Sequence, residues 1–368
     1  MQSEKKYSVI FLLLFLIMGS CDTVNERLSS EDQNFRQPSF SEDWIIPKDD
    51  IIHVTGLDGI VSIDEPDFAH VSDIDFVDDK RLIEGVKIEG RLRAYPHQVL
   101  DWHEIVNDRI GDTSLAITYC PLTGTGIAWN RKNMEFGISG LLYHGNMVPY
   151  DRQTFSRYSQ MQLRAVNGPM AGTRLETYPV LQTTWETWKA MYPNSDVLTR
   201  NTGHSYNYRG FAYGEEYLEE NSATNFPIRN PDDRLPKKKR VHGVMGGVRV
   251  DENTEVRVYV IDRMKSGIEV IEDDFLGNEI VIVGSREKKF TISYQRTLPG
   301  GPLLQFEAVQ DALPVVMKDQ EGNFWDVFGY AVEGPRVGSQ LTPTKSYTGY
   351  WFAWADFFPG LEIYGEGD

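Results

Sequence analysis

Short apolar segments separated by turn-forming residues recur along the whole chain. Segments of this kind are typical of β-strands. In the first half of the chain we expect strands over residues 85–94, 114–120, 126–130 and 135–143. The second of these strands ends at Cys120, because Pro121 cannot donate a backbone hydrogen bond to a sheet. The thiol of Cys120 would then lie at the mouth of a strand.

Two segments have the spacing of helices instead. The first begins near Pro96, whose ring suits a first helical turn, and its apolar side chains are Val99, Trp102 and Val106. The second is capped by Thr183 or Thr184 and ends before Pro193. Between the first helix and the next strand, residues 107–112 are expected to form a turn. Short strands accompanied by these helices predict an α+β fold.

A repeated pattern links the two halves of the sequence. A shift of 166 residues superposes residues 165–169 on residues 331–335, where Ala, Val, Gly and Pro recur in the same order. The same shift pairs two tryptophans of each half, Trp185 with Trp351 and Trp188 with Trp354. We therefore expect two tandem, divergent copies of a strand-rich α+β unit, packed as one pseudo-symmetric body.

The repeat divides the chain into segments. The first copy covers residues 46–205, a connector covers residues 206–236, and a degenerate second copy covers residues 237–368. With a shift of 165 residues Cys120 aligns with Ser285, so the second copy lacks the Cys120 loop. Any chemistry is therefore expected in the first copy, whereas the tryptophans kept in both copies are expected in the core.

The N-terminal residues have the features of an export signal. Two lysines precede an apolar run over residues 9–18, which is too short for a helix that spans a bilayer. Gly19-Ser20-Cys21 follows and resembles the lipobox of bacterial lipoproteins, in which the cysteine is acylated. We expect a signal peptide over residues 1–20, lipidation at Cys21 and a polar tether over residues 21–45. The lipid would anchor the protein to a membrane of the cell envelope, either at the outer membrane or facing the periplasm.

Charge and cysteine content narrow the choice of partners. The chain has 37 Lys and Arg against 54 Asp and Glu, a formal net charge of −17. An acidic chain is unsuited to binding the phosphates of nucleic acid, and we read its one basic run, residues 237–240, as a solvated linker. With Cys21 lipidated, Cys120 is the remaining one of two cysteines, so no internal disulfide is expected.

Several motifs resemble a known bacterial family, domain of unknown function 3179. They are AYPHQVLDWHEIVND, AITYCPLTGT, FGISGLLYHGNMVPYDRQT, GPMAGTRLE and TTWETW, in this order along the chain. The resemblance implies no established activity, cofactor or catalytic residue. Many members read CPLCGT at the loop, where this chain has Thr123 in the place of the second cysteine. The resemblance therefore gives no support to dithiol redox cycling, which needs a resolving thiol.

Cys120 is the candidate nucleophile. A reactive thiol needs a lowered pKa and usually a histidine within hydrogen-bond reach. The family motif favours His103 as that partner, whereas packing of a helix and a strand as a hairpin favours His97 at the level of the thiol. Both histidines therefore remain candidate partners of Cys120. No spacing typical of zinc or copper ligands occurs, so no metal site is predicted, with Cys120 as a metal ligand kept as an alternative.

Other polar residues are candidates for ligand binding. Thr123, Gly124 and Thr125 belong to the Cys120 loop, and Asp151 with Arg152 would supply an acid and a cation, or simply a salt-bridged turn. Two classes of function remain. We favour a module that binds a small molecule or an envelope protein in a cleft at the Cys120 loop. The alternative is an envelope enzyme that uses Cys120 as a nucleophile or as a metal ligand.

Overall fold

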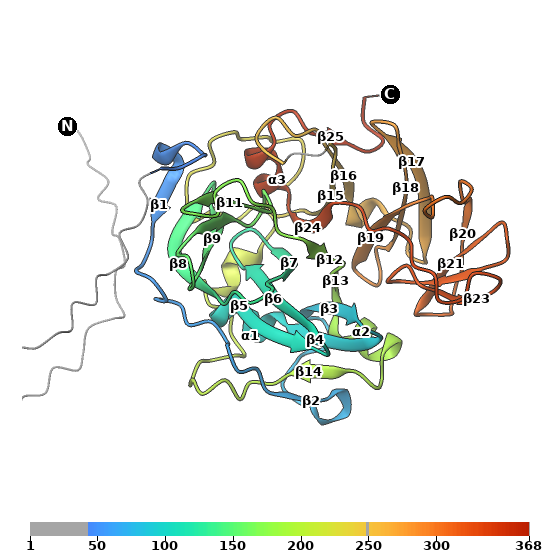
Figure 1. Ribbon diagram of the computed structural model, residues 1–368, viewed down its shortest axis with the longest axis horizontal. Coiled ribbons are helices and arrows are strands. Elements are labelled where there is room, and N and C mark those ends of the chain that lie inside the picture. Colours follow the sequence, from blue (N-terminus) through green and yellow to red (C-terminus); the bar gives the residue numbers. More distant parts are fainter. Residues whose placement is uncertain (1–42, 248–249, 368) are drawn as a thin grey trace, which may run out of the picture. The chain divides into compact units, whose positions relative to one another are not determined.

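Strands make up most of the regular structure. The computed structural model describes residues 43–247 and 250–367, and within these ranges the strands form six sheets (Figure 1). The predicted signal peptide, the predicted lipidation at Cys21 and the tether as far as residue 42 lie outside the described residues and stay predictions.

Three sheets come from the first half of the chain. The first has the order β1-β8-β9-β10-β11, with β1 (Ile51–His53), β8 (Phe136–Tyr143), β9 (Asn146–Asp151), β10 (Arg157–Ser159) and β11 (Arg164–Asn167). The second has the order β12-β7-β6-β5, with β12 (Thr177–Tyr178), β7 (Thr125–Asn130), β6 (Thr113–Cys120) and β5 (Ile105–Ile110). The third has the order β13-β3-β4-β14-β2, with β13 (Leu181–Thr184), β3 (Leu82–Ile88), β4 (Arg91–Pro96), β14 (Asp196–Leu198) and β2 (Phe68–His70). Apart from the parallel pair β4–β14, their recorded strand pairs are antiparallel.

The second half supplies the other three sheets. One has the order β24-β15-β16-β25, with β24 (Ser346–Tyr350), β15 (Arg240–Met245), β16 (Val256–Val260) and β25 (Glu362–Ile363). Another contains β17 (Glu269–Phe275), β18 (Asn278–Ser285) and β19 (Phe290–Gln295) in sequential order. The last contains β20 (Phe306–Ala308), β21 (Val315–Asp319), β22 (Phe324–Asp326) and β23 (Ala331–Glu333), also in sequential order.

Helices are few and short in the described residues. The α-helices are α1 (His97–His103), α2 (Trp185–Met191) and α3 (Trp351–Phe357), each of seven residues. Four 3₁₀ turns accompany them, η1 (Lys48–Asp50), η2 (Val71–Asp73), η3 (Glu215–Leu218) and η4 (Ile261–Arg263). Thr184 caps α2 by accepting a hydrogen bond from the backbone N–H of Thr187, and the helix ends before Pro193, so the expected cap and end are confirmed.

The sheet β12-β7-β6-β5 contributes to two hydrophobic cores. Successive side chains of a strand point to opposite faces. In β6, Tyr119 joins a core that also contains Trp188 and Trp325, which we call the Tyr119 core. Cys120 joins a different core, the Cys120 core, which also contains Trp354. Burial on both faces explains why β6 reads as a continuous apolar run.

The tryptophans of α2 and α3 pack against strands at glycines. A Cβ atom on Gly85 of β3 would lie 2.1 Å from the ring of Trp188, and a Cβ atom on Gly243 of β15 would lie 2.4 Å from the ring of Trp354. Both tryptophans are fully buried, so their predicted place in the core is confirmed. Glycine is required at both strand positions because each ring occupies the space of a side chain.

The predicted α+β class is wrong, because the fold is predominantly β. The first expected helix is shorter than its apolar spacing suggested: α1 ends at His103, and Val106 lies in β5. Residues 107–110, expected in a turn, also belong to β5. Both faces of β5 are buried, so apolar residues occur on both of its faces. Val106 falls at a helical spacing from Val99 and Trp102 only by coincidence.

The predicted two tandem copies of an α+β unit are also wrong, because both halves consist mainly of strands and share their larger cores. Each of the two larger cores draws on both halves of the chain, while a third, smaller core around Tyr259 and Phe275 lies within the second half. The described residues 43–247 and 250–367 belong to one compact unit. The first half forms sheets of five, four and five strands, whereas the second half forms sheets of four, three and four. The matching sequences lie on corresponding elements, β11, β13 and α2 in the first half and β23, β24 and α3 in the second. The strand order β13-β3-β4-β14 also recurs as β24-β15-β16-β25, so the halves share an arrangement of strands without forming separate units.

Candidate functional site

A cleft of about 720 Å³ brings residues of both halves of the chain together. Its polar and aromatic lining includes His97 and Asp101 of α1, Tyr119 of β6, Arg240 of β15 and Tyr350 of β24. The sequence separates these residues by up to 253 positions, as the numbers of His97 and Tyr350 show. The strand–helix junctions place them at one cleft.

His97 forms a buried pair with Glu84 of β3. The imidazole Nε2 lies 2.8 Å from Glu84 Oε1, and the His97 ring packs on the Tyr119 ring with centroids 4.0 Å apart. Burial lowers the pKa of His97, although the hydrogen bond to Glu84 opposes this shift. A neutral imidazole that donates from Nε2 to a carboxylate keeps a lone pair on Nδ1. Gly126 makes room for the pair, since a Cβ atom there would lie 2.1 Å from Glu84 Oε1.

Arg240 enters the cleft without a carboxylate in contact. Its guanidinium donates to Gln182 Oε1, with Nε at 2.9 Å, and lies 3.5 Å from the carbonyl of Lys289. Among the described residues no Asp or Glu lies within ion-pair distance of it, although the charge of Glu84 is close enough to favour its protonated form. Burial lowers the pKa of Arg240, but a guanidinium remains charged at neutral pH.

Gln182 connects the arginine to the His97–Glu84 pair. Its Nε2 donates to Glu84 Oε1 at 2.7 Å and to the carbonyl of Gly124 at 3.3 Å, while its Oε1 accepts from Arg240. Gly124 has a φ of +64°, and a Cβ atom there would lie 3.0 Å from the ring of Tyr350. The predicted ligand residue Gly124 thus supports the cleft through its carbonyl and through its lack of a side chain.

Asp101 adds an acid to the same cleft. The residue is 5% exposed, and its Oδ1 is buried without a hydrogen-bond partner among the described residues. Burial raises the pKa of Asp101 well above its ordinary value, so the protonated form is favoured. A neutral carboxylic acid can donate one hydrogen bond and accept another.

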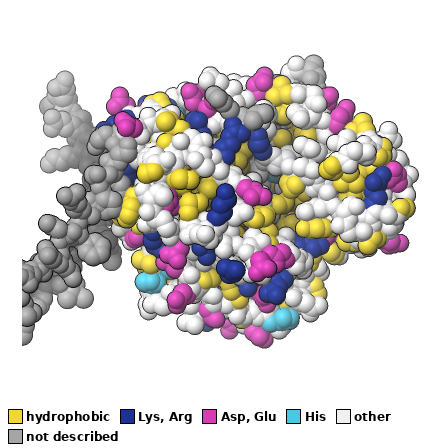
Figure 2. All heavy atoms as spheres, in the orientation of Figure 1, with side chains coloured by type: hydrophobic (Ala, Val, Ile, Leu, Met, Phe, Trp, Pro, Cys, Tyr) yellow, Lys and Arg dark blue, Asp and Glu magenta, His cyan; other side chains and the backbone are white. Residues whose placement is uncertain are grey.

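Charged residues at the rim are largely paired with one another. Arg81 bonds Glu215 at 2.8 Å, and Asp262 bonds both Lys239 at 2.9 Å and Lys289 at 3.0 Å. Figure 2 shows the same interspersion of basic and acidic side chains over the face of the molecule in view. Like Lys80 and Lys238 of the lining, Arg240 has no acidic contact among the described residues, but its guanidinium is joined to the His97–Glu84 pair through Gln182.

Cys120 does not line this cleft. The thiol is 1% exposed and belongs to the Cys120 core, on the opposite face of β6 from Tyr119. Burial, together with the nearby charge of Glu104, raises the pKa of the thiol to about 11. The strand does end at Cys120 as predicted, but a buried thiol with a raised pKa is a poor nucleophile at neutral pH.

The two candidate histidines have partners other than Cys120. His103 Nδ1 lies 2.7 Å from the carbonyl of Val61, and its Nε2 lies 2.8 Å from the hydroxyl of Tyr208. His103 is fully buried, and burial lowers its pKa. His97 is the candidate that reaches the cleft, where its partner is Glu84 instead of the thiol.

Thr123 and Thr125 belong to a closed polar network beneath the loop. Their hydroxyls lie 2.9 Å apart, and Asn146 Nδ2 donates to both, at 2.9 and 3.0 Å. Gln160 Oε1 accepts from Thr125 at 2.7 Å and from Asn146 at 2.8 Å. All four side chains are fully buried, so the two threonines tie the loop to β9 and do not face the cleft.

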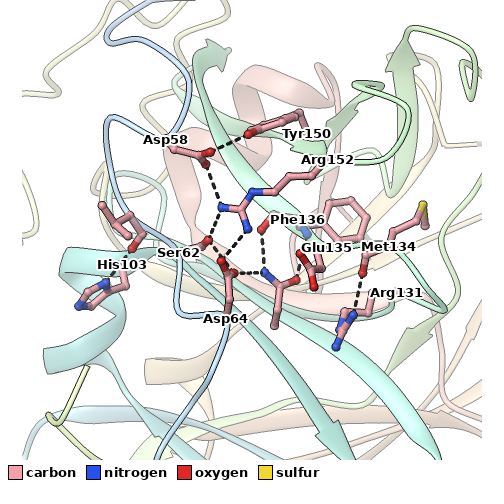
Figure 3. A network of polar contacts seen from close by, with 12 residues as sticks. Asp58, Ser62, Asp64, His103, Arg131, Met134, Glu135, Phe136, Tyr150 and Arg152 are labelled. Carbon is pink, nitrogen blue, oxygen red and sulfur yellow. Dashed lines mark hydrogen bonds and ion pairs between the residues drawn. The ribbon is translucent and has the colours of Figure 1, made fainter. Parts of the chain in front are cut away.

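Arg152 and Asp151 also have protein partners. Figure 3 shows the Arg152 guanidinium between Asp58 and Asp64, which it contacts at 3.2 and 2.6 Å. Asp151 is fully buried, and its carboxylate accepts hydrogen bonds from the backbone N–H of Thr154 at 2.6 Å and from the hydroxyl of Tyr158 at 3.1 Å. Both side chains are thus bonded within the protein, Arg152 to acids of the segment before β2 and Asp151 to residues of its own hairpin, and their role in ligand binding stays a prediction.

Arg240, Glu84, Asp101 and Gln182 were missed by sequence reasoning. Arg240 stood in the run that was read as a solvated linker, yet it begins β15, and the preceding Lys238 is buried. The buried ammonium of Lys238 donates to the carbonyl of Tyr217. A usable signal was the largely apolar segment VHGVM directly after Arg240, since a short apolar run of this kind is consistent with a buried strand.

Two further properties concern metals and membranes. Within residues 43–247 and 250–367, no group of three or more His, Cys, Asp or Glu side chains is arranged to hold a metal ion. The alternative of Cys120 as a metal ligand therefore gains no support from its neighbours. None of the helices in the described part of the chain is long and apolar enough to cross a bilayer.

These features define a predominantly β protein whose cleft holds a His–Glu pair, an arginine and a buried acid. The family described as protein of unknown function (DUF3179) matches residues 57–361. The chain belongs to this family, as its motifs suggested. No curated protein matches the chain, and no solved structure matches it.

Proposed function

We propose that the protein binds a small anionic molecule in the cleft between His97 and Arg240. The observation that carries this proposal is the Arg240 guanidinium, which enters the cleft without a carboxylate in contact among the described residues. A guanidinium suits carboxylate and phosphate groups because its parallel N–H groups can donate two hydrogen bonds to one anion.

The other lining residues fit the remainder of such a ligand. His97 offers an acceptor at Nδ1, and the protonated acid of Asp101 offers a donor. The rings of Tyr119 and Tyr350 supply apolar surface. The volume of about 720 Å³ is that of a small-molecule site, since such pockets measure about 300–1,000 Å³.

A thermal-shift screen tests the proposal. Acetate, succinate, citrate, pyruvate and inorganic phosphate are added to the wild-type protein, and we expect at least one of them to raise its Tm. Arg240→Gln should remove that shift, whereas Arg209→Gln, which changes an exposed arginine, should keep it. A shift that survives in Arg240→Gln, or no shift with any of these anions, contradicts the proposal.

The His97–Glu84 pair favours a second candidate, an enzyme that uses His97 as a general base. A histidine oriented by a carboxylate is the usual arrangement for accepting a proton from a bound substrate. This base replaces Cys120 in the enzyme alternative, because the thiol is buried in the Cys120 core. Proton NMR in D₂O should then show exchange of the methyl protons of pyruvate with wild-type protein and none with His97→Gln. Equal rates with both proteins would leave the cleft as a binding site alone.

For its cellular place, we propose an exported protein anchored to a membrane of the cell envelope by lipid on Cys21. Support comes from the basic residues, the short apolar run and the Gly19-Ser20-Cys21 sequence. The ligand of the cleft would then be a small molecule or a protein of the cell envelope. Cys21→Ser should move the protein from the membrane fraction to the soluble fraction, and unchanged fractionation would refute the anchor.

A further inference from the structure

A second, mostly apolar pocket includes Leu122 of the Cys120 loop in its lining. It has a volume of about 240 Å³ and is lined by residues of β8, β9 and the segments around Val54, Leu122, Tyr213 and Phe226. Its side chains include Ile138, Leu141, Leu142, Met147 and Val148. The cleft residue Tyr119 does not reach it, whereas Leu122, three positions further along, does.

One carboxylic acid stands among these apolar side chains. Glu104 is 5% exposed, lines the pocket, and accepts a hydrogen bond at Oε1 from the hydroxyl of Tyr213 at 3.2 Å. Its Oε2 has no hydrogen-bond partner, and its carboxylate has no ion pair, among the described residues. Burial raises the pKa of Glu104 to about 7.

The backbone holds this acid in an uncommon conformation. Glu104 has a φ of +58° between α1 and β5, where residues other than glycine are rarely found. Its N–H donates to the carbonyl of Leu100 at 2.8 Å, and its own carbonyl accepts from Tyr119 at 2.7 Å. These two bonds fix the position from which the side chain enters the pocket.

Burying an acid in an apolar pocket costs free energy unless a partner compensates it. The hydroxyl of Tyr213 bonds Glu104, and the thiol of Cys120 and the carboxyl of Asp101 are close enough for the charge of Glu104 to act on them. None of these groups is a cation. We propose that the pocket binds a small amphiphilic amine, whose ammonium group pairs with Glu104 and whose apolar body fills the space along β8 and β9.

Three probes of similar size test this site, namely benzylamine, benzyl alcohol and toluene. Binding to the full chain is measured by titration with two-dimensional NMR. We expect benzylamine to bind best, and more tightly at pH 8 than at pH 6, because Glu104 loses its proton over this range while the amine keeps its own. Toluene should bind equally at both pH values.

Variants separate the charge from the cavity. Glu104→Gln should weaken benzylamine roughly tenfold, as the loss of a charge-assisted hydrogen bond predicts, and leave toluene unchanged. Glu65→Gln, which changes an exposed acid, should leave both affinities unchanged. Val54→Trp, placed at a rim position that is 55% exposed, should weaken all three probes by filling the entrance.

Two results would overturn the inference. One is benzylamine affinity that is the same in Glu104→Gln as in wild type, which would show that the acid does not recognise the amine. The other is failure of all three probes to bind the wild-type protein, which would show that the pocket is not a site. Either result is independent of the anion screen, because that screen reports on Arg240 in the other cleft.

Discussion

At the scale of single residues, the alternation of side chains along β6 determines which residue next to the Cys120 loop reaches the cleft. Tyr119 lines the cleft with His97, while its neighbour Cys120 belongs to the Cys120 core, where the charge of Glu104 acts on its thiol. The residue that drew attention in the sequence is therefore a packing residue. Its neighbour, which did not, contributes to the candidate site.

The buried thiol should be unreactive in the native state. We expect iodoacetamide at neutral pH to label Cys120 only as fast as the protein unfolds, because the thiol is 1% exposed and burial raises its pKa to about 11. Mass spectrometry of samples with and without urea measures the two rates. Fast labelling of native protein would restore Cys120 as a candidate nucleophile.

Glu104 predicts a pH dependence of stability with a definite sign. Its pKa is about 7 in the folded state and 4.5 ordinarily, so folding favours its protonated form. The free energy of unfolding should therefore lose roughly 3 kcal/mol from this group as pH rises from below 4.5 to above 7. Glu104→Gln cannot ionise and should gain stability relative to wild type at pH 8 compared with pH 5.

Urea unfolding of both proteins at both pH values measures this difference. Histidines such as His97 and His242, whose pKa values burial lowers, contribute the opposite slope, but they are present in both proteins and cancel in the comparison. An equal gap between the two proteins at pH 5 and pH 8 would contradict a raised pKa for Glu104.

At the scale of elements, a strand glycine and a helix tryptophan form one packing unit. Trp188 of α2 occupies the space above Gly85 and donates a hydrogen bond from Nε1 to Ser195 at 2.9 Å. The unit recurs with Trp354 and Gly243, which accounts for the similar local sequences of the two halves. Short helices gain their stability from such contacts, since seven residues are too few for an independent helix.

Substitutions on either side of this contact should both destabilise the protein. Trp188→Ala should lower the free energy of unfolding by about 3–5 kcal/mol through loss of burial, and Gly85→Ala by about 1–3 kcal/mol through overpacking. Trp102→Ala, at a half-buried tryptophan, is the control and should cost less. Chemical denaturation measures all three, and a neutral Gly85→Ala would mean that the ring is not seated there.

At the scale of the whole molecule, the two larger cores are shared between the halves of the sequence. The Tyr119 core includes Trp188 and Trp325, and the Cys120 core includes Trp129 and Trp354, so each combines residues from both halves. The connector also takes part, because Tyr217 donates to the carbonyl of Leu122 at 2.7 Å.

Residues 237–368 expressed alone should therefore fold poorly. Removing the first half exposes the apolar side chains that the second half contributes to both cores. We expect circular dichroism of the fragment to show no cooperative thermal transition, with the full chain as the control. A cooperative transition in the fragment that matches one in the full chain would contradict shared burial.

Local features were predicted well wherever a residue acts through its own backbone. Pro121 ends β6, Thr184 caps α2, and Pro193 lies beyond the end of that helix, as expected. The membership of the family was also readable from consecutive motifs. The end of α1 could not be predicted, because Val106, which continues the helical spacing of apolar residues, lies in the strand β5.

The sequence by itself thus determined the end of β6, the cap and end of α2, the buried tryptophans and the family, since these depend on local backbone chemistry and on hydrophobicity. Only the tertiary structure decided that the fold is predominantly β and that both cores span the chain. It alone also placed Arg240 in the same cleft as His97 and buried the acid of Glu104 in the second pocket. Those relations join residues far apart in the chain, and the contacts that create them exist only once the strands have packed.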